Sequence, residues 1–268
     1  MDVRGRRVLV TGASRGIGAS LVRAFADAGA RVALVARSQD AIEKLAADVG
    51  GDAYATDLTD RAAVSGLLER AERDGEVDVL VNNAGVDDTG CFADADPETL
   101  EALLRVNLLT PMELSRQALA NMLPRGRGHI VNISSTAAMV PFPGLTAYGT
   151  SKAGLSRFTA GLRAELRGSG IGTTLVETGG VRTDMVDHTR TYGPTRRAWA
   201  RVEALRLSID VEPDVVARAV VQAVQRNRAA VHLPRRVFAY PLLAHAPWHI
   251  TDALLLGVDR HTNESGGT

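Results

Sequence analysis

The sequence predicts an α/β protein with one doubly wound parallel sheet of about seven strands and helices on both of its faces. Short apolar runs rich in Val, Leu and Ile alternate with longer stretches of helical periodicity along most of the chain. The runs are continuously apolar, which is typical of parallel strands buried on both faces. The first run also leads directly into a glycine-rich turn, Gly12–Gly18. A strand, a tight turn and a helix in this order are the first unit of such a sheet.

The apolar runs predict strands at Arg7–Val10, Arg31–Ala36, Asp52–Thr56, Val77–Asn82, Gly128–Ile133, Gly172–Glu177 and Ala229–Leu233. Helical periodicity predicts helices at Ile17–Ala28, Gln39–Val49, Arg61–Asp74, Pro97–Met122, Ala147–Arg167 and Pro213–Arg226. Two of these helices open on a proline, a residue that suits the first helical turn. No Gly/Ser/Pro-rich linker separates the elements, so residues 1–268 are expected to form a single domain.

Composition restricts the function. Lys+Arg and Asp+Glu are both 31 and the formal net charge is +0, which argues against a nucleic-acid partner. The single cysteine, Cys91, excludes an intramolecular disulfide and fits a reducing compartment. Residues Met1–Arg7 lack the apolar run of a signal peptide, and no clean apolar stretch reaches the ~18 residues of a membrane span. A soluble, cytoplasmic protein is expected.

The glycine turn has the chemistry of a dinucleotide site in a Rossmann-type sheet. Gly12 permits the turn, Gly16 lets a phosphate approach the backbone, and Gly18 allows the helix to pack closely on the strand. The spacing is Gly-x-x-x-Gly-x-Gly, and a glycine turn alone can also be purely structural. Its position directly after the first strand favours cofactor binding.

The second strand indicates which dinucleotide binds. NAD-specific sites carry an acidic residue at this strand end for the ribose 2′-hydroxyl. Here Ala36 stands at that position and Arg37 follows, while Arg15 lies in the glycine turn. Because arginine suits phosphate, NADP(H) is favoured, with NAD(H) as the alternative. Solvated surface arginines are the competing interpretation. Asp57, after the third strand, is expected to bind the adenine amino group or to cap the next helix.

Tyr148 and Lys152 are four residues apart and therefore share one face of a helix. Apart from Lys44, Lys152 is the only lysine in the chain. A free tyrosine titrates near ~10, and a neighbouring ammonium favours its phenolate. Separately, the two would be read as a half-buried helix tyrosine and a solvated lysine. Behind a cofactor turn they indicate proton transfer in carbonyl or alcohol redox chemistry.

Several motifs follow one another in order: Thr11–Gly18, Asn82–Gly85, Asn107, Ser134 with Ser135, and Tyr148 with Lys152. Together they resemble the classical short-chain dehydrogenase/reductase family over roughly residues 5–235. Each motif is weak alone, but the order and spacing are specific.

The resemblance implies catalytic roles. Ser135 would orient the substrate, with Ser134 as the alternative by one position. Tyr148 would be the acid in reduction and the base in oxidation, and Lys152 would contact the nicotinamide ribose and lower the pKa of Tyr148. Asn107 would hold a water in a proton relay. No metal is expected. The cofactor would contact Gly12, Ser14, Arg15, Gly16, Ile17, Gly18, Arg37, Ser38, Asp57, Leu58, Asn83, Ala84, Gly85, Tyr148, Lys152, Val181 and Thr183.

The function so implied is an NADP(H)-dependent oxidoreductase that interconverts a carbonyl and an alcohol on a hydrophobic substrate, in the reducing direction. The single domain would then be both dinucleotide-binding and catalytic. The alternative is a non-catalytic dinucleotide-sensing or scaffold protein on the same fold. The resemblance also implies a homodimer or homotetramer.

Three segments leave questions open. Thr178 stands where the family has proline before the loop that borders the nicotinamide, so looser cofactor binding there or a shifted loop is expected, but not a loss of binding. Residues 185–210 are expected to be the substrate lid, whose apolar side chains either line a pocket or pack a helix pair. Residues 235–268 form a C-terminal extension. It would cover the pocket, pack on another subunit or, less favoured, lie on a membrane surface.

Overall fold

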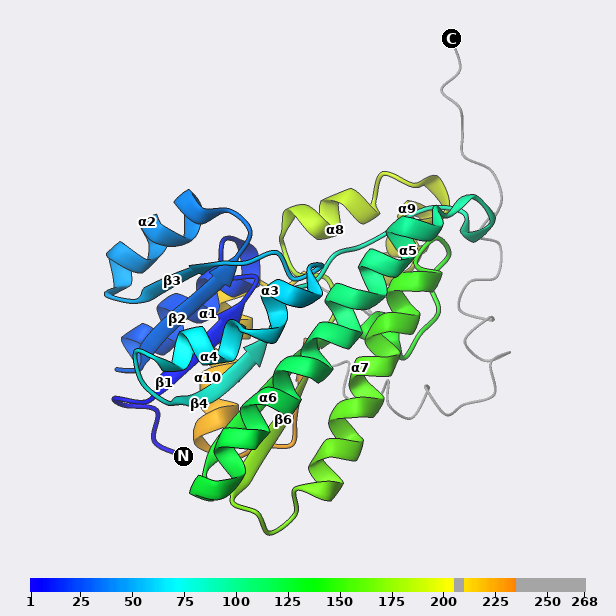
Figure 1. Cartoon of the computed structure of the whole chain (residues 1–268). Coiled ribbons are helices and arrows are strands. Elements are labelled where there is room, and N and C mark those ends of the chain that lie inside the picture. Colours follow the sequence, from blue (N-terminus) through cyan, green and yellow to red (C-terminus); the bar gives the residue numbers. More distant parts are fainter. Residues whose placement is uncertain (205–209, 235–268) are drawn as a thin grey trace.

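The structure, a computed structural model, describes residues 1–204 and 210–234 (Figure 1). The sheet is fully parallel, with strand order β3-β2-β1-β4-β5-β6-β7. The predicted doubly wound sheet is therefore confirmed. Its strands are β1 Arg7–Thr11, β2 Arg31–Ala36, β3 Asp52–Ala55, β4 Val77–Asn82, β5 Gly128–Ser135, β6 Ile171–Thr178 and β7 Ala230–Leu233.

Helices cover both faces of this sheet. They are α1 Gly16–Asp27, α2 Gln39–Val49, α3 Arg61–Ser65, α4 Leu67–Glu72, α5 Pro97–Leu104, α6 Thr110–Arg125, α7 Thr146–Glu165, α8 Asp184–Thr189, α9 Gly193–Ala204 and α10 Pro213–Gln225. Short 3-10 turns occur at Phe92–Asp94 and Thr136–Ala138, and a π-turn occurs at Arg105–Leu109.

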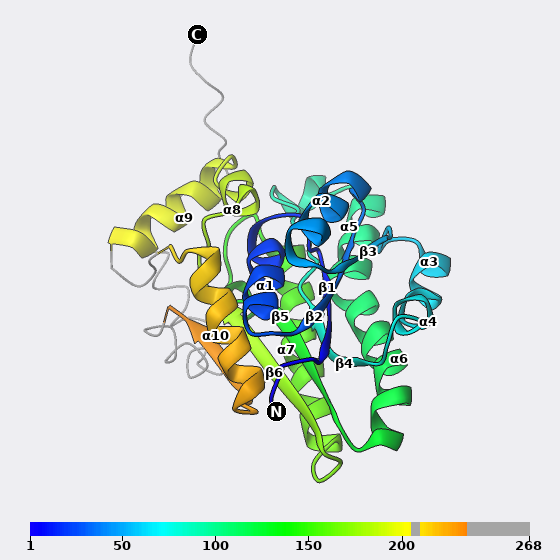
Figure 2. The ribbon, with the colours of Figure 1, turned by 90° about the vertical axis from the view of Figure 1, so that its left-hand side faces the viewer.

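Two hydrophobic cores lie on opposite faces of the sheet, and the alternation along β1 shows the division. Val8 and Val10 pack into the core under α1, α2 and α10, whereas Leu9 packs into the core under α4, α6 and α7. Figure 2 shows α1 and α10 on one side of the sheet and α4 and α6 on the other. Because both faces are covered, the central strands β1, β2 and β4 are mostly apolar and buried, as the sequence pattern indicated.

The strand order reverses at β1, which pairs with β2 on one side and β4 on the other. At such a switch point the connections leave in opposite directions and open a crevice at the carboxyl ends of the strands. The glycine turn after β1 and the loop after β4 flank this crevice. The fold therefore brings the two earliest sequence motifs together.

Two predicted helices are interrupted. The segment predicted as Pro97–Met122 is divided into α5, the π-turn and α6. Pro111 has no N–H to donate to the carbonyl of Asn107, so the regular hydrogen-bond ladder cannot continue there. The segment predicted as Arg61–Asp74 breaks at Gly66, between α3 and α4.

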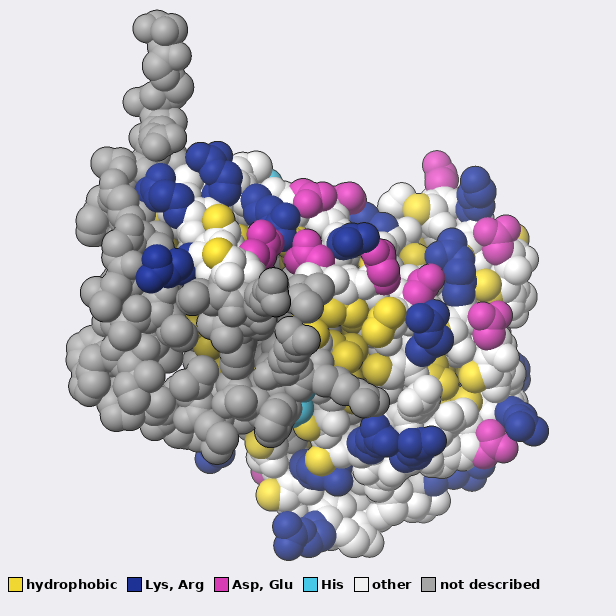
Figure 3. Space-filling view, turned by 180° about the vertical axis from the view of Figure 1, so that it is seen from behind, with side chains coloured by type: hydrophobic (Ala, Val, Ile, Leu, Met, Phe, Trp, Pro, Cys, Tyr) yellow, Lys and Arg dark blue, Asp and Glu magenta, His cyan; other side chains and the backbone are white. Residues whose placement is uncertain are grey.

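Surface charge agrees with the balanced composition. On the face opposite to that of Figure 1, basic and acidic side chains are intermingled across the upper and right-hand parts (Figure 3). Among the described helices, none is long and apolar enough to cross a membrane. The expected C-terminal extension, residues 235–268, lies outside the described residues, as does the lid segment 205–209.

His129 on β5 gives the fold a testable acid sensitivity. It is buried, its Nε2 lies 2.8 Å from Thr174 Oγ1, and burial lowers its pKa from 6.5 to about 3. Between these values the unfolded chain binds the proton and the folded chain does not, so stability falls as the pH falls. From pH 6.5 to about pH 5, His129 should lower the free energy of unfolding by about 1.5 kcal/mol.

Denaturant titrations of the wild type and H129Q over this range should show a smaller pH dependence for the variant. An equal pH dependence of the free energy of unfolding in the wild type and in H129Q would contradict the lowered pKa of His129.

Candidate active site

The turn between β1 and α1 has the shape of a phosphate cradle. Gly12 and Gly16 have φ of 66° and 55°, a backbone region that favours glycine. A Cβ on Gly18 would lie 2.0 Å from the carbonyl oxygen of Gly12, so the helix approaches the turn as closely as a glycine allows. Within the described chain, no side chain caps the N-terminus of α1, so its first N–H groups are available to an anion. The cradle therefore fits a dinucleotide pyrophosphate.

The loop after β4 is hydrogen-bonded to this turn. Thr11 Oγ1 accepts from the backbone N–H groups of Asn83 at 3.0 Å and Ala84 at 3.1 Å. Asn83 Nδ2 donates to the Thr11 carbonyl at 2.9 Å. In the strands below, Asn82 Nδ2 donates to Asn132 Oδ1 at 2.8 Å and links β4 to β5. These bonds fix the wall of the crevice beside the glycine turn.

At the adenosine end, Asp57 accepts from the backbone N–H and the hydroxyl of Thr59 at 2.9 and 2.8 Å. These hydrogen bonds lower its pKa, and the charge of Arg37 contributes in the same direction. Arg37 and Asp57 thus face one region, at the carboxyl ends of β2 and β3. The cap of α3 is Asp60, which accepts from two backbone N–H groups, so the N-cap interpretation of Asp57 is wrong.

The other residues predicted to bind the cofactor differ in how exposed they are and in the partners they have. Ser14 and Ile17 are half-buried in the glycine turn, and Ile17 packs against the core. Ser38 is exposed at the start of α2. Leu58 is buried, and its carbonyl accepts from Thr110 Oγ1 at 2.9 Å. Arg15 extends from the glycine turn to Asp184 on α8, at 2.8 Å.

Tyr148, Lys152 and Ser135 come together where β5 meets α7. Lys152 is 4% exposed, and its Nζ donates to the carbonyl of Ile133 at 3.1 Å. The same Nζ lies 5.8 Å from the centroid of the Tyr148 ring. Ser135 shares a hydrogen bond with Tyr148, whereas the Ser134 hydroxyl points into α7 and donates to the Lys152 carbonyl at 3.1 Å. This geometry favours Ser135 over Ser134 as the serine that faces the reacting oxygen.

The pKa of Tyr148 differs from the sequence expectation. Burial raises it from 10.0 to about 12, the hydrogen bond from Ser135 lowers it, and the charge of Asp87 raises it. Burial also lowers the pKa of Lys152 from 10.5 to about 8. The expectation of a lowered Tyr148 pKa is therefore wrong for the chain itself, because burial has the largest effect and raises this pKa. Near neutral pH the site contains a protonated phenol beside a charged amine.

Asn107 is fully buried in the π-turn, a kind of helix defect that is frequent at functional sites. Its side chain accepts from the Val86 N–H at 2.9 Å and donates to the Val86 carbonyl at 2.8 Å. It also donates to Ser151 Oγ at 3.0 Å. A Cβ on Gly85 would lie 3.3 Å from both Asn107 Oδ1 and Lys152 Nζ. Asn107 thus fixes the loop after β4 against α7 and lies close to Lys152.

The loop after β6 is held in place although it lacks proline. Thr178 is the last residue of β6 and pairs with Ser135 and Leu233 in the flanking strands. Beyond it, Val181 forms a β-bridge with Val211. Thr178 thus belongs to the sheet, and looser cofactor binding or a shifted loop beyond it stays a prediction. Thr183 Cγ2 would lie 3.2 Å from a Cβ on Gly16, so the loop also contacts the cofactor turn.

The segment expected to be the substrate lid contains α8 and α9. Trp199 is buried and packs against Phe142 with the rings tilted by 42° and their centroids 5.1 Å apart, which favours helix packing over pocket lining for this aromatic. Arg190 pairs with Glu203 at 2.9 Å and Asp210 at 3.1 Å, so its charge is already compensated. Met185 and Val186 on α8 are half-buried.

Sequence reasoning missed two contacts of α8 with the rims of the crevice. The first is the ion pair of Arg15 with Asp184. In the second, His188 Nδ1 lies 2.6 Å from Asp87 Oδ2, although the two residues are 101 positions apart. Asp87 lies two residues after the Asn82–Gly85 motif, and this proximity was the only signal in the sequence.

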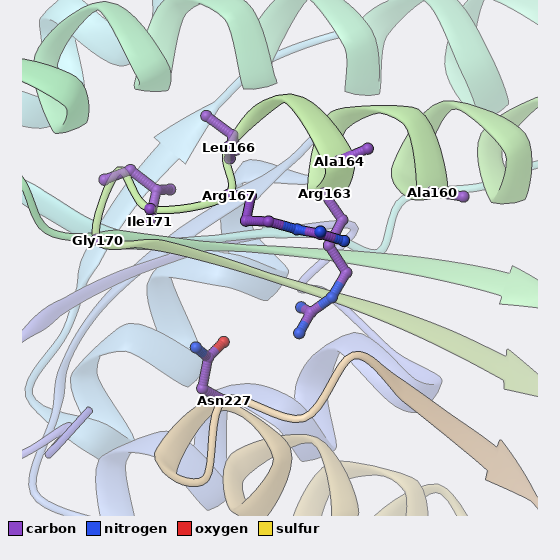
Figure 4. Close-up of a pocket in the computed structure, with 9 residues that line it drawn as sticks. Ala160, Arg163, Ala164, Leu166, Arg167, Gly170, Ile171 and Asn227 are labelled. Carbon is purple, nitrogen blue, oxygen red and sulfur yellow. The ribbon is translucent and has the colours of Figure 1, made fainter.

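A cavity of about 470 Å³ lies away from this site, at the amino end of β6 and the end of α7 (Figure 4). Arg163, Arg167 and Asn227 line it. The Arg163 guanidinium donates a hydrogen bond to the Thr173 carbonyl at 2.7 Å. Over residues 1–204 and 210–234, no group of His, Cys, Asp and Glu side chains is arranged to hold a metal ion.

Comparisons with known proteins agree with this geometry. Residues 6–192 match the family described as short chain dehydrogenase. The chain is 37% identical over 234 residues to the ketoacyl reductase HetN of Nostoc, covering 85% of this chain and 78% of HetN. It is 36% identical over 235 residues to the probable oxidoreductase EphD of Mycobacterium tuberculosis, covering 82% of this chain but only 40% of EphD. A short-chain dehydrogenase from Sphingobium yanoikuyae, solved in complex with NADPH, superimposes with a TM-score of 0.74, 28% identity and 98% coverage of both chains.

Proposed function

Because the chain belongs to the short chain dehydrogenase family and is an NAD(P)-dependent oxidoreductase, we propose that it reduces a carbonyl group on a hydrophobic substrate with NADPH. The observation that carries this proposal is the convergence of Ser135, Tyr148 and Lys152 beside the glycine cradle. Three polar groups with complementary proton chemistry then face one crevice at the switch point of the sheet.

The nicotinamide, when bound, would supply the hydride, and the chain would supply position and a proton. The Ser135 hydroxyl would donate a hydrogen bond to the carbonyl oxygen, where negative charge develops. Tyr148 Oη would transfer its proton to that oxygen. The Lys152 ammonium would hold the ribose and stabilise the phenolate that remains. Asn107 would position the loop after β4 and connect Lys152 to solvent.

The raised pKa of Tyr148 supports reduction as the direction. A phenol with a pKa of about 12 is protonated at neutral pH, as the acid must be. In oxidation the same group would have to start as a phenolate. An oxidised nicotinamide would contribute the positive charge that favours this form.

The substrate proposal rests on the lid and on HetN. Met185 and Val186 are half-buried on α8 next to the crevice, and apolar lining favours an apolar substrate. HetN is called a ketoacyl reductase. We infer a ketone or aldehyde with an apolar substituent, and we place the protein in the cytoplasm as a homodimer or homotetramer.

The test is NADPH consumption with a panel of ketones and aldehydes of graded chain length, followed by absorbance. We expect kcat/KM to rise with apolar chain length. NADPH binding without turnover of any carbonyl would favour the sensor alternative and contradict the proposal.

The choice of NADP(H) gives a separate prediction. Replacing Arg37 by Asp should weaken NADPH binding and improve NADH binding, because a carboxylate repels the 2′-phosphate and accepts from a 2′-hydroxyl. Dissociation constants for both cofactors, measured by fluorescence titration, check this. R61D, an exposed charge reversal at the start of α3, is the control. An unchanged preference in R37D would remove Arg37 from the cofactor site.

A further inference from the structure

Helix α8 contacts both rims of the crevice through residues that share one of its faces. Asp184 and His188 are four positions apart and therefore point the same way. Asp184 pairs with Arg15 of the glycine turn at 2.8 Å, and His188 pairs with Asp87 of the loop after β4 at 2.6 Å. The first pair involves a cation on which the proposed NADP(H) site depends.

We propose that Asp184 is a cofactor-specificity residue, because its carboxylate competes with the 2′-phosphate of NADP(H) for the guanidinium of Arg15. This inference rests on the proposed function, in which the chain binds NADP(H), and on the expectation from the sequence that Arg15 of the glycine turn contributes to binding that phosphate. It assigns to α8 a role in setting the cofactor preference as well as in covering the substrate.

The charge and the position of Asp184 both indicate that it weakens phosphate binding to Arg15. A guanidinium that hydrogen-bonds a carboxylate has fewer donors free for a phosphate, and the two anions repel each other at short range. Both partners are largely exposed, at 77% and 76%, so solvent screens the pair. An exposed pair of this kind changes an equilibrium by about two- to fivefold. The effect on affinity is therefore modest but measurable.

Asp184 is fixed near Arg15 by contacts on both sides. The preceding segment is attached to the sheet by the bridge between Val181 and Val211. Thr183 lies against the glycine turn, next to Gly16. Beyond Asp184, the His188 pair with Asp87 holds the same helix face. Because these contacts do not involve Arg15, a phosphate that binds Arg15 still has the Asp184 carboxylate beside it.

If Asp184 helped Arg15 to bind the phosphate, removing its charge would change NADPH affinity in the opposite direction. If Asp184 instead oriented Arg15 toward the phosphate, its removal would weaken NADPH binding. A D184N variant separates the two, because asparagine keeps the size of the side chain and removes only the charge. D187N is the matched control. Asp187 is exposed on the same short helix, and no ion pair of its side chain occurs within the described residues.

The experiment is isothermal titration calorimetry of the full chain with NADPH, NADH, adenosine 2′,5′-bisphosphate and 5′-AMP. We expect D184N to bind the two 2′-phosphorylated ligands about two- to fivefold more tightly than the wild type, with the gain reduced at high salt. Affinities for NADH and 5′-AMP should stay unchanged, and D187N should match the wild type.

Two failures are distinguishable. Equal or weaker binding of the 2′-phosphorylated ligands by D184N, while the wild type binds NADPH, overturns the role of Asp184 alone. A wild type that binds none of the four ligands overturns the proposed function and this inference together. A gain of equal size in D187N would also overturn the inference, because it would show a general effect of net charge.

Discussion

Replacing Tyr148 by phenylalanine should lower kcat for carbonyl reduction by about 10²–10⁴-fold, the usual contribution of a positioned general acid. Phenylalanine keeps the ring near Lys152 but has no hydroxyl to donate. The dissociation constant for NADPH should stay close to that of the wild type, because the cradle at Gly12–Gly18 is separate from the phenol. Steady-state kinetics and a fluorescence titration of NADPH give the two quantities.

The matched control is Y192F. Tyr192 is a half-buried tyrosine at the start of α9, and it contacts the loop after β5 near Gly144. Losing this hydroxyl should leave kcat nearly unchanged. A Y148F enzyme that retained wild-type kcat would exclude Tyr148 as the proton donor.

The second large effect concerns the glycine cradle. A Cβ on Gly18 would lie 2.0 Å from the Gly12 carbonyl oxygen and 2.7 Å from Asn83 Nδ2. The oxygen belongs to the backbone, so G18A can be accommodated only if the turn and α1 move apart. We expect a loss of about 1–3 kcal/mol in the free energy of unfolding, as for overpacked sites. NADPH affinity should fall strongly, because the first N–H groups of α1 would be displaced.

G161A provides the comparison for this substitution. Gly161 lies on the exposed side of α7, and a Cβ there would have open space around it. Alanine at that position should stabilise the protein by about 0.4–1 kcal/mol through the unfolded state. Thermal denaturation with and without NADPH measures both effects. A G18A protein with wild-type stability and NADPH affinity would show that the turn is not tightly packed.

The sequence was most informative where local pattern determines structure. Continuous apolar runs located β2 and β4 at their observed bounds, and the four-residue spacing placed Tyr148 and Lys152 on one face of α7. The resemblance already pointed to Ser135, with Ser134 as the alternative, and the structure adds that the Ser135 hydroxyl faces Tyr148 whereas the Ser134 hydroxyl donates to the Lys152 carbonyl.

The remaining features depend on tertiary contacts. The π-turn around Asn107 follows from a proline four residues later, within a segment whose periodicity still reads as one helix. The raised pKa of Tyr148 arises from burial and from Asp87, neither of which the local motif reveals. The two polar contacts of α8, of Asp184 with Arg15 and of His188 with Asp87, connect residues more than a hundred positions apart. The two residues of each contact lie in different elements, so no local sequence pattern contains both of them.

The central claim is that Tyr148 and Ser135 together hold the reacting oxygen beside the nicotinamide. A crystal structure of the chain with NADP⁺ and an unreactive amide or alcohol analogue of a ketone substrate tests it directly. We expect the analogue oxygen to lie within about 3.2 Å of both Tyr148 Oη and Ser135 Oγ. A ternary complex in which that oxygen binds elsewhere, with Tyr148 Oη beyond hydrogen-bond distance, would exclude these two residues as the groups that hold it.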